Sequence, residues 1–310
     1  MENTRAKTTR NSLILLLTAT IWGMAFVSQS KGMDYMHPFT FNGVRSLIGA
    51  AGILVYILIS RKIAGDKATK LDWKLNVRAG LLCGIFLTIA STLQQFGIKY
   101  TSVGKAGFIT TLYIIFVPMF GIFLKKKVAP VVWAAAGMAA VGMYLLCMTE
   151  SLRLGAGDIM VFLCAIAFAI QIMTVDHYAA RIDGAVVSCI QFTVCGVVCC
   201  IGALIWGQPT FGQIQEGLGA LLYAGVLSCG VGYTLQIVGQ KGLNPTVAAL
   251  IMSLESVIAT ISGWIAYKIG FLSTDQTLTP RQIAGCVIVF AAVILVQLPP
   301  EWFRFGKKND

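Results

Sequence analysis

The sequence of 310 residues is poor in charge, and poorest in acidic residues. Charged residues make up 12% of the chain, and 13 residues are Asp or Glu. Because a soluble domain carries about 25% charged residues, this composition cannot cover a surface that faces water. The hydrophobic fraction of 57% and the mean hydropathy of +0.78 instead indicate a chain that crosses a membrane several times.

The sequence also lacks the motifs of several catalytic and channel classes. It has no Walker motif, which argues against ATP-driven transport. It has two histidines, His37 and His177, and no G-x-S-x-G or H-E-x-x-H pattern, so a membrane hydrolase or metalloenzyme would lack its reacting groups. It also has no ring of charges and no TVGYG-like filter, which argues against an ion channel. We therefore expect no enzymatic activity, no metal and no cofactor.

Ten apolar stretches are each long enough to cross the hydrocarbon core as a helix of about 20 residues. Short loops separate them, so no soluble domain is expected between spans. The sequence therefore predicts an all-α integral membrane protein with ten transmembrane helices. The predicted spans are 12–30, 38–60, 78–98, 104–124, 128–148, 157–176, 184–206, 215–239, 245–267 and 281–298.

The basic residues are distributed unevenly between the two sides of the membrane. Ten spans place both chain ends on one side, which holds 17 of the 24 Lys and Arg residues. The opposite side holds 6, and Arg45 lies within a span. Because Lys and Arg concentrate on the cytoplasmic side, both termini are predicted to be cytoplasmic. This bias also accounts for the net charge of +11 without nucleic acid as a partner.

The second half of the chain repeats the first. A shift of 142 residues aligns identical residues such as Gln94 with Gln236, and a shift of 146 pairs Trp22 with Phe168. Since each half holds five spans, the two copies enter the membrane from opposite sides, as in the inverted repeats of secondary transporters. The predicted organisation is an N-terminal tail 1–11, a first repeat 12–148, an external linker 149–156, a second repeat 157–298 and a C-terminal tail 299–310.

Five short motifs lie at set places along the predicted spans. They are Ile21-Trp22-Gly23, His37-Pro38 with Arg45 seven residues on, Lys99-Tyr100-Thr101-Ser102, Phe116-Val117-Pro118 and Leu254-Glu255-Ser256-Val257. In this order they resemble the drug/metabolite transporter superfamily, and within it the ten-helix EamA-type family. The resemblance covers about residues 12–298 and implies a multi-pass transporter of the inner or plasma membrane.

Two positions depart from the pattern of that family. Members often end the fourth span with Gly-Glu and follow the Glu of the ninth span with Pro, whereas this chain has Lys125-Lys126-Lys127 and Ser256. Without the proline, we expect a continuous backbone hydrogen-bond ladder near Glu255. Pro118 removes a backbone donor from the fourth span and predicts a hinge there. These departures prevent the transfer of a substrate from any relative.

Glu255 is the acidic residue predicted to lie near the middle of the bilayer, about ten residues into its span. Burying a carboxylate costs several kcal/mol, so Glu255 must face a cavity, pair with a cation or stay protonated. It is our candidate for proton coupling or for binding a cation. The alternative is a carboxylate that joins two helices by a hydrogen bond.

Arg45 is the basic residue that lies deep within a span. It can serve as a fixed countercharge for Glu255 or for an anionic group of the substrate. The alternative is an arginine that packs helices and donates to backbone carbonyls near the outer rim. Its distance from Glu255 does not follow from the sequence.

Uncharged polar and aromatic residues complete the candidate substrate site. Gln94 and Gln236 are repeat mates, so both are expected near the pseudo-twofold axis, where inverted-repeat carriers bind substrate. Tyr113 is the repeat mate of Glu255. A buried amide is also suited to joining helices, and Trp22 is also suited to packing or to facing lipid. The remaining candidates are Asn42, Gln95, Gln171 and Gln191.

Together these features predict a secondary transporter that exports small organic metabolites or drug-like solutes by alternating access, with or without proton coupling. An uncoupled facilitator of a metabolite or a sugar-like solute is one alternative. A membrane sensor or scaffold that does not transport is a second, from another class. The expected partners are a small-molecule substrate, the lipid bilayer and, in the coupled case, protons. One chain holds both halves, so a monomer suffices, and a dimer is compatible with the sequence.

Overall fold

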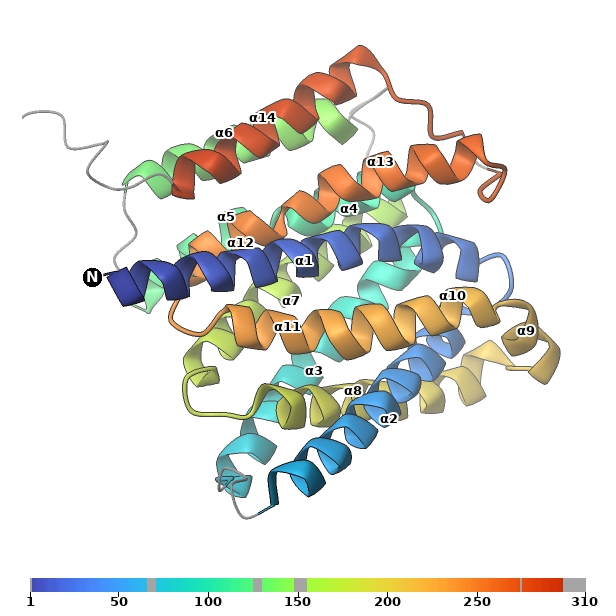
Figure 1. Ribbon diagram of the computed structural model, residues 1–310. Helices are drawn as coiled ribbons and strands as arrows, with labels where there is room; N and C mark the ends of the chain where they lie inside the picture. The colour runs from blue at the N-terminus through green and yellow to red at the C-terminus, as the bar shows by residue number, and fades with distance from the viewer. Residues whose placement is uncertain (1, 66–70, 125–129, 148–154, 274, 298–310) are drawn as a thin grey trace, which may run out of the picture.

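The computed structural model describes residues 2–65, 71–124, 130–147, 155–273 and 275–297. Most of the predicted linker 149–156 and all of the predicted tail 299–310 lie outside these ranges, as do Lys125, Lys126 and Lys127. Within them the chain forms helices and no strands (Figure 1). The first half contains α1 (Glu2–Gly32), α2 (Pro38–Ala64), α3 (Trp73–Ile98), α4 (Val103–Thr111), α5 (Tyr113–Phe123) and α6 (Pro130–Cys147).

The second half continues with the same kind of structure and includes two π-helical segments, η2 and η3. Its elements are α7 (Ala156–Tyr178), α8 (Gly184–Gly202), η2 (Ala203–Gly207), α9 (Phe211–Glu216), α10 (Leu218–Leu222), η3 (Tyr223–Gly232), α11 (Tyr233–Gly239), α12 (Pro245–Met252), α13 (Leu254–Lys268) and α14 (Pro280–Gln297).

These elements combine into ten apolar stretches, as the sequence predicts. Eight helical stretches of 21 to 27 described residues are long and apolar enough to cross a membrane, and two shorter ones, Pro130–Gly142 and Pro280–Leu295, complete the set. The predicted all-α membrane fold is confirmed, and most span boundaries agree within a few residues. The main difference is α1, which begins at Glu2, inside the segment predicted as an N-terminal tail.

The fourth and ninth spans are each interrupted, at places that differ by one residue in the 142-residue repeat. Leu112 separates α4 from α5, and Ser253 separates α12 from α13. Around Ser253, its Oγ donates to the carbonyl of Leu250 at 2.7 Å, and Ser256 Oγ donates to the carbonyl of Ser253 at 2.8 Å. The predicted continuous ladder near Glu255 is therefore wrong, because serine hydroxyls can satisfy the backbone carbonyls of a turn as well as helical N–H groups do.

Pro118 does not coincide with the interruption of its span. α5 runs from Tyr113 to Phe123 and includes Pro118, whereas the break lies six residues earlier, at Leu112. There, Thr111 Oγ1 donates to the carbonyl of Phe108 at 2.9 Å. A hinge at Pro118 stays a prediction.

Helix contacts in the first half are matched by equivalent contacts in the second. α2 packs against α8, and α6 packs against α14, at opposite edges of the bundle (Figure 1). In the first half α3 packs against α7, and the matching contact in the second half is that of η3 and α11 with α1. Likewise, α4 and α5 contact α7, and α12 and α13 contact α1. This reciprocity is the arrangement expected of two inverted five-helix repeats, and it brings α1, α3, α7 and α11 together at the centre.

Candidate functional site

A small cavity lies at the centre of the bundle, between the interrupted spans. Its volume is about 30 Å³, room for about two water molecules. Both halves of the chain contribute to its walls. The polar and aromatic lining consists of Trp22, Phe26, Gln29, Arg45, Ser46, Ser91, Gln94, Thr110, Tyr113, Phe168, Gln171, Phe192, Ser228, Tyr233, Gln236 and Glu255.

Most of the lining follows the sequence repeat. The 142-residue shift pairs Leu87 with Cys229, Ser91 with Tyr233, Gln94 with Gln236 and Tyr113 with Glu255. The 146-residue shift pairs Trp22 with Phe168, Ala25 with Gln171, Phe26 with Ile172 and Ser46 with Phe192. All sixteen of these residues face the cavity, so its walls are built from equivalent helix faces of the two halves.

Glu255 lies in the first turn of α13, directly after the break at Ser253. Its side chain is buried, with 4% exposed, and Tyr113 Oη donates a hydrogen bond of 3.0 Å to Glu255 Oε1. The two ion pairs found among the described residues are Lys31–Asp34 and Lys105–Asp158, so neither involves Glu255. The carboxyl group thus lies buried in the cavity wall and accepts a hydrogen bond from the hydroxyl at the equivalent position of the other half.

Arg45 also faces the cavity, from α2, and is 5% exposed. Its guanidinium Cζ lies 5.3 Å from the centroid of the Phe41 ring, and its Nε has no hydrogen-bond partner among the described residues. Neither of the two ion pairs includes it. The countercharge for Glu255 that the sequence leaves open is therefore not formed as a direct ion pair.

The predicted glutamines divide into two hydrogen-bonded groups across the cavity. Gln171 and Gln236 bond to each other reciprocally, with Nε2–Oε1 distances of 3.5 and 3.2 Å. Gln94 Nε2 donates to Thr110 Oγ1 at 3.2 Å. The first pair joins α7 to α11 and the second joins α3 to α4, so each amide holds a neighbouring helix and also presents polar atoms to the cavity.

Three predicted residues lie outside the lining of the described cavity. Asn42 Nδ2 donates to the carbonyl of Ser91 at 2.9 Å, and Gln95 Nε2 donates to the carbonyl of Gln29 at 3.1 Å. Gln191 is fully buried. Asn42 and Gln95 therefore join helices in this conformation. Joining helices is the alternative role that the sequence leaves open for a buried amide.

An aromatic group in the lining was missed by the sequence interpretation. The ring of Tyr233 lies 4.5 Å from that of Trp22 and 5.0 Å from that of Phe192, centroid to centroid. Trp22 Nε1 donates to the carbonyl of Ser228 at 3.4 Å, within the π-helical η3. Helical spacing could have identified Tyr233, because residues three apart lie on the same face of a helix. Tyr233 precedes Gln236 by three residues and therefore shares its face, as Ser91 shares the face of Gln94.

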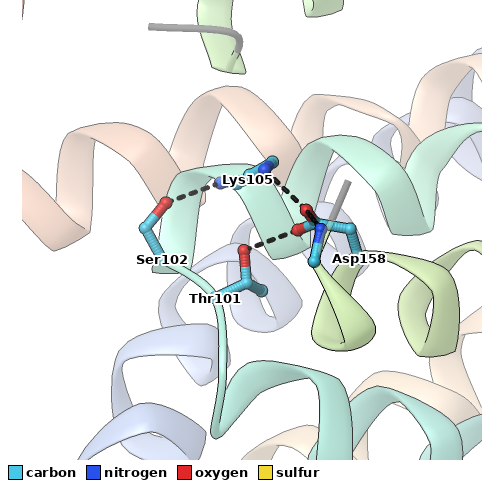
Figure 2. Close-up of polar contacts among 5 residues, drawn as sticks. Thr101, Ser102, Lys105 and Asp158 are labelled. Atoms are coloured by element: carbon cyan, nitrogen blue, oxygen red, sulfur yellow. Dashed lines mark hydrogen bonds and ion pairs between the residues drawn. The ribbon is translucent and has the colours of Figure 1, made fainter. Parts of the chain in front are cut away.

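A second polar cluster lies at the end of the bundle where α4 and α7 begin. Lys105 Nζ lies 2.6 Å from Asp158 Oδ2, and Thr101 Oγ1 donates to Asp158 Oδ1 at 2.9 Å (Figure 2). The backbone N–H of Gly155 also donates to Asp158 Oδ2, at 2.8 Å. The Asp158 side chain is 4% exposed, so this carboxylate joins the start of the fourth span to the start of the sixth.

Comparisons with known proteins agree with this architecture. The model of the EamA-like transporter family matches residues 10–148 and 155–298. An uncharacterized transporter of Archaeoglobus fulgidus is 27% identical over 290 residues, which cover 92% of this chain and 84% of the relative. The uncharacterized transporter YwfM of Bacillus subtilis is 24% identical over 295 residues, 94% of each chain. A protein crystal structure matches with a TM-score of 0.73 at 16% identity, over 96% of this chain and 99% of the other, and so shares the fold.

Proposed function

Because the chain belongs to the EamA-like transporter family, we propose that it exports a small organic solute across the inner or plasma membrane by alternating access between its two halves. The observation that carries this proposal is the central cavity, which both halves line at equivalent positions and which contains one buried carboxyl group. Inverted-repeat carriers bind their substrates at such an interface near the bilayer midplane.

Binding a solute requires the cavity to widen. Its volume of about 30 Å³ is small beside the roughly 300–1,000 Å³ of pockets that bind drug-sized ligands. The breaks at Leu112 and Ser253 lie next to Tyr113 and Glu255 in the lining. Bending at these two places would move α5 and α13 without disturbing the helical hydrogen bonds on either side, which is the use that transporters make of discontinuous helices.

In this proposal Glu255 couples transport to protons. A protonated Glu255 is neutral and is tolerated in a buried site, whereas the carboxylate requires a compensating charge. Glu255 takes a proton from outside and releases it to the cytoplasm in exchange for the solute. The alternative is an uncoupled facilitator. The Tyr113–Glu255 hydrogen bond supports this alternative, because it gives Glu255 a structural role that requires no proton transfer.

Flux through liposomes that contain this protein alone tests the proposal. The vesicles are loaded with amino acids, sugars, nucleobases and cationic amphiphiles, and release is measured by mass spectrometry with and without a pH gradient. Release of one solute class that the gradient accelerates supports the coupled transporter. Release above that of protein-free vesicles but indifferent to the gradient supports the facilitator. Release equal to that of protein-free vesicles would contradict the transport proposal and favour a sensor or scaffold.

Breaking the Lys105–Asp158 pair is expected to open the end of the bundle opposite the N-terminus. Asp158→Asn keeps the side-chain shape but loses a charged hydrogen bond worth about 1.5–3 kcal/mol, equivalent to a roughly 10- to 100-fold change in the open population. Cys229, which is buried in the cavity lining, should then react faster with a membrane-impermeant thiol reagent from that side, measured by mass spectrometry.

The matched control for this experiment is Asp34→Asn, which breaks the exposed Lys31–Asp34 pair. We expect it to leave the labelling rate of Cys229 unchanged. Equal labelling of Cys229 in the wild type and in Asp158→Asn would show that the Lys105–Asp158 pair does not restrict access.

A further inference from the structure

We propose that Arg45 is the anion-binding residue of the cavity and holds a carboxylate group of the transported solute. This inference rests on the proposed transport function and specifies one chemical feature of the substrate. The residue involved, Arg45, belongs to α2, whereas the residue proposed for proton coupling, Glu255, belongs to α13.

The first observation is that Arg45 is buried without an ion-pair partner among the described residues. The residue is 5% exposed, its Nε has no hydrogen-bond partner among the described residues, and neither ion pair found there includes it. The guanidinium Cζ lies 5.3 Å from the centroid of the Phe41 ring. A buried unpaired guanidinium is costly. A packing arginine would lower that cost by donating to carbonyls, and the Arg45 side chain donates to no carbonyl of the described residues.

The second observation is that Arg45 breaks the symmetry of the cavity. Its repeat mate is Gln191, which lies outside the lining, although the next residues along the chain, Ser46 and Phe192, both line it. The positive charge is therefore a property of one wall of the cavity and not a requirement of the repeated helix packing. A fixed charge on one wall orients a solute that carries the opposite charge.

The lining indicates a carboxylate rather than a doubly charged anion. The guanidinium fork matches a carboxylate bidentately, and Ser46 and Ser91 add hydroxyl groups to the lining. The Ser46 hydroxyl donates to Cys195 Sγ at 3.5 Å. The Ser91 hydroxyl contacts Cys195 Sγ at 3.4 Å and donates to the carbonyl of Thr88 at 3.5 Å. Sulfur is a weak partner and a contact of 3.5 Å is long for a hydroxyl hydrogen bond, so both hydroxyls can turn to a ligand. Arg45 is the basic residue of the described lining, and Glu255 shares the cavity. One positive charge balances a monoanion, whereas a phosphate dianion would exceed it and be repelled by an ionised Glu255.

Thermal unfolding of the purified protein in detergent tests this assignment. The probes are the common L-amino acids and short monocarboxylic acids such as 4-methylpentanoate, each compared with its own amide. A ligand that binds the folded state raises the melting temperature by mass action. We expect at least one carboxylate to raise it while the matching amide does not. In Arg45→Gln the affinity for that carboxylate should fall roughly 10- to 100-fold, the loss of a charged hydrogen bond.

Two further variants separate binding from packing. Arg78 is an exposed arginine of α3, and Arg78→Gln should bind the carboxylate like the wild type. Arg45→Lys keeps the positive charge but loses the paired guanidinium N–H donors, so it should bind the carboxylate with intermediate affinity. Without ligand, Arg45→Gln should melt at the wild-type temperature or above it, because it removes an unpaired buried charge. A packing role predicts a lower melting temperature.

Three results would overturn the assignment. They are a panel in which no carboxylate raises the melting temperature, a carboxylate and its amide that stabilise the protein equally, and an unchanged affinity for the carboxylate in Arg45→Gln. These measurements detect binding and need no flux. A carboxylate that binds through Arg45 but is not released from liposomes would therefore contradict the transport function and leave the anion site intact.

Discussion

Replacing Glu255 by glutamine is expected to abolish the dependence of transport on a pH gradient. Gln has nearly the shape of Glu and can still accept the hydrogen bond that Tyr113 donates at 3.0 Å, but it cannot take up and release a proton. With exchange of one proton for one solute, a gradient of one pH unit sustains about tenfold solute accumulation, equivalent to about 1.4 kcal/mol. The Glu255→Gln variant should equilibrate the solute to equal concentrations on both sides.

The measurement is solute distribution across proteoliposomes with an imposed pH gradient, with the amount of inserted protein quantified. Glu216→Gln is the matched control, because Glu216 is an exposed acidic residue of α9 outside the cavity. It should retain the full gradient response. If Glu255→Gln accumulates solute as the wild type does, Glu255 is not the coupling residue and its role is the hydrogen bond between α13 and α5.

Replacing Gly23 by alanine is expected to destabilise the centre of the bundle. A methyl group on the Gly23 Cα would lie 2.6 Å from Ile258 Cβ and 2.7 Å from the carbonyl oxygen of Glu255. The carbonyl belongs to the backbone of α13, so α1 and α13 must separate. Overpacking of this kind costs about 1–3 kcal/mol. The melting temperature should fall, and transport should fall with it, because the shift acts on Trp22 and Glu255 together.

Gly52→Ala provides the matched control in α2. Beyond its chain neighbours and the nearby backbone of α2, no described atom lies within 4 Å of the position that its methyl group would take, and alanine favours a helix over glycine by about 1 kcal/mol. We therefore expect this variant to melt at the wild-type temperature or slightly above. Melting of Gly23→Ala at the wild-type temperature would show that α1 and α13 can separate at no cost.

The sequence by itself determined the ten spans, the recognition of the EamA-type family and the burial of Glu255. These properties depend on local composition and length, because a run of about 20 apolar residues crosses the hydrocarbon whatever its neighbours are. The 142-residue repeat added one long-range relation. It paired Tyr113 with Glu255 and Gln94 with Gln236, and all four side chains line one cavity.

The tertiary structure alone decided which polar side chains meet. Asn42 and Gln95 are as buried and polar as Gln94, yet they bond to neighbouring backbones and leave the lining. The reason is that the face a helix turns to the centre is set by the helices packed on its other sides, which the local sequence does not specify. The same holds for the break at Ser253, where hydroxyl groups replaced the expected ladder, and for Arg45, which packing places in the cavity without Glu255 as an ion-pair partner.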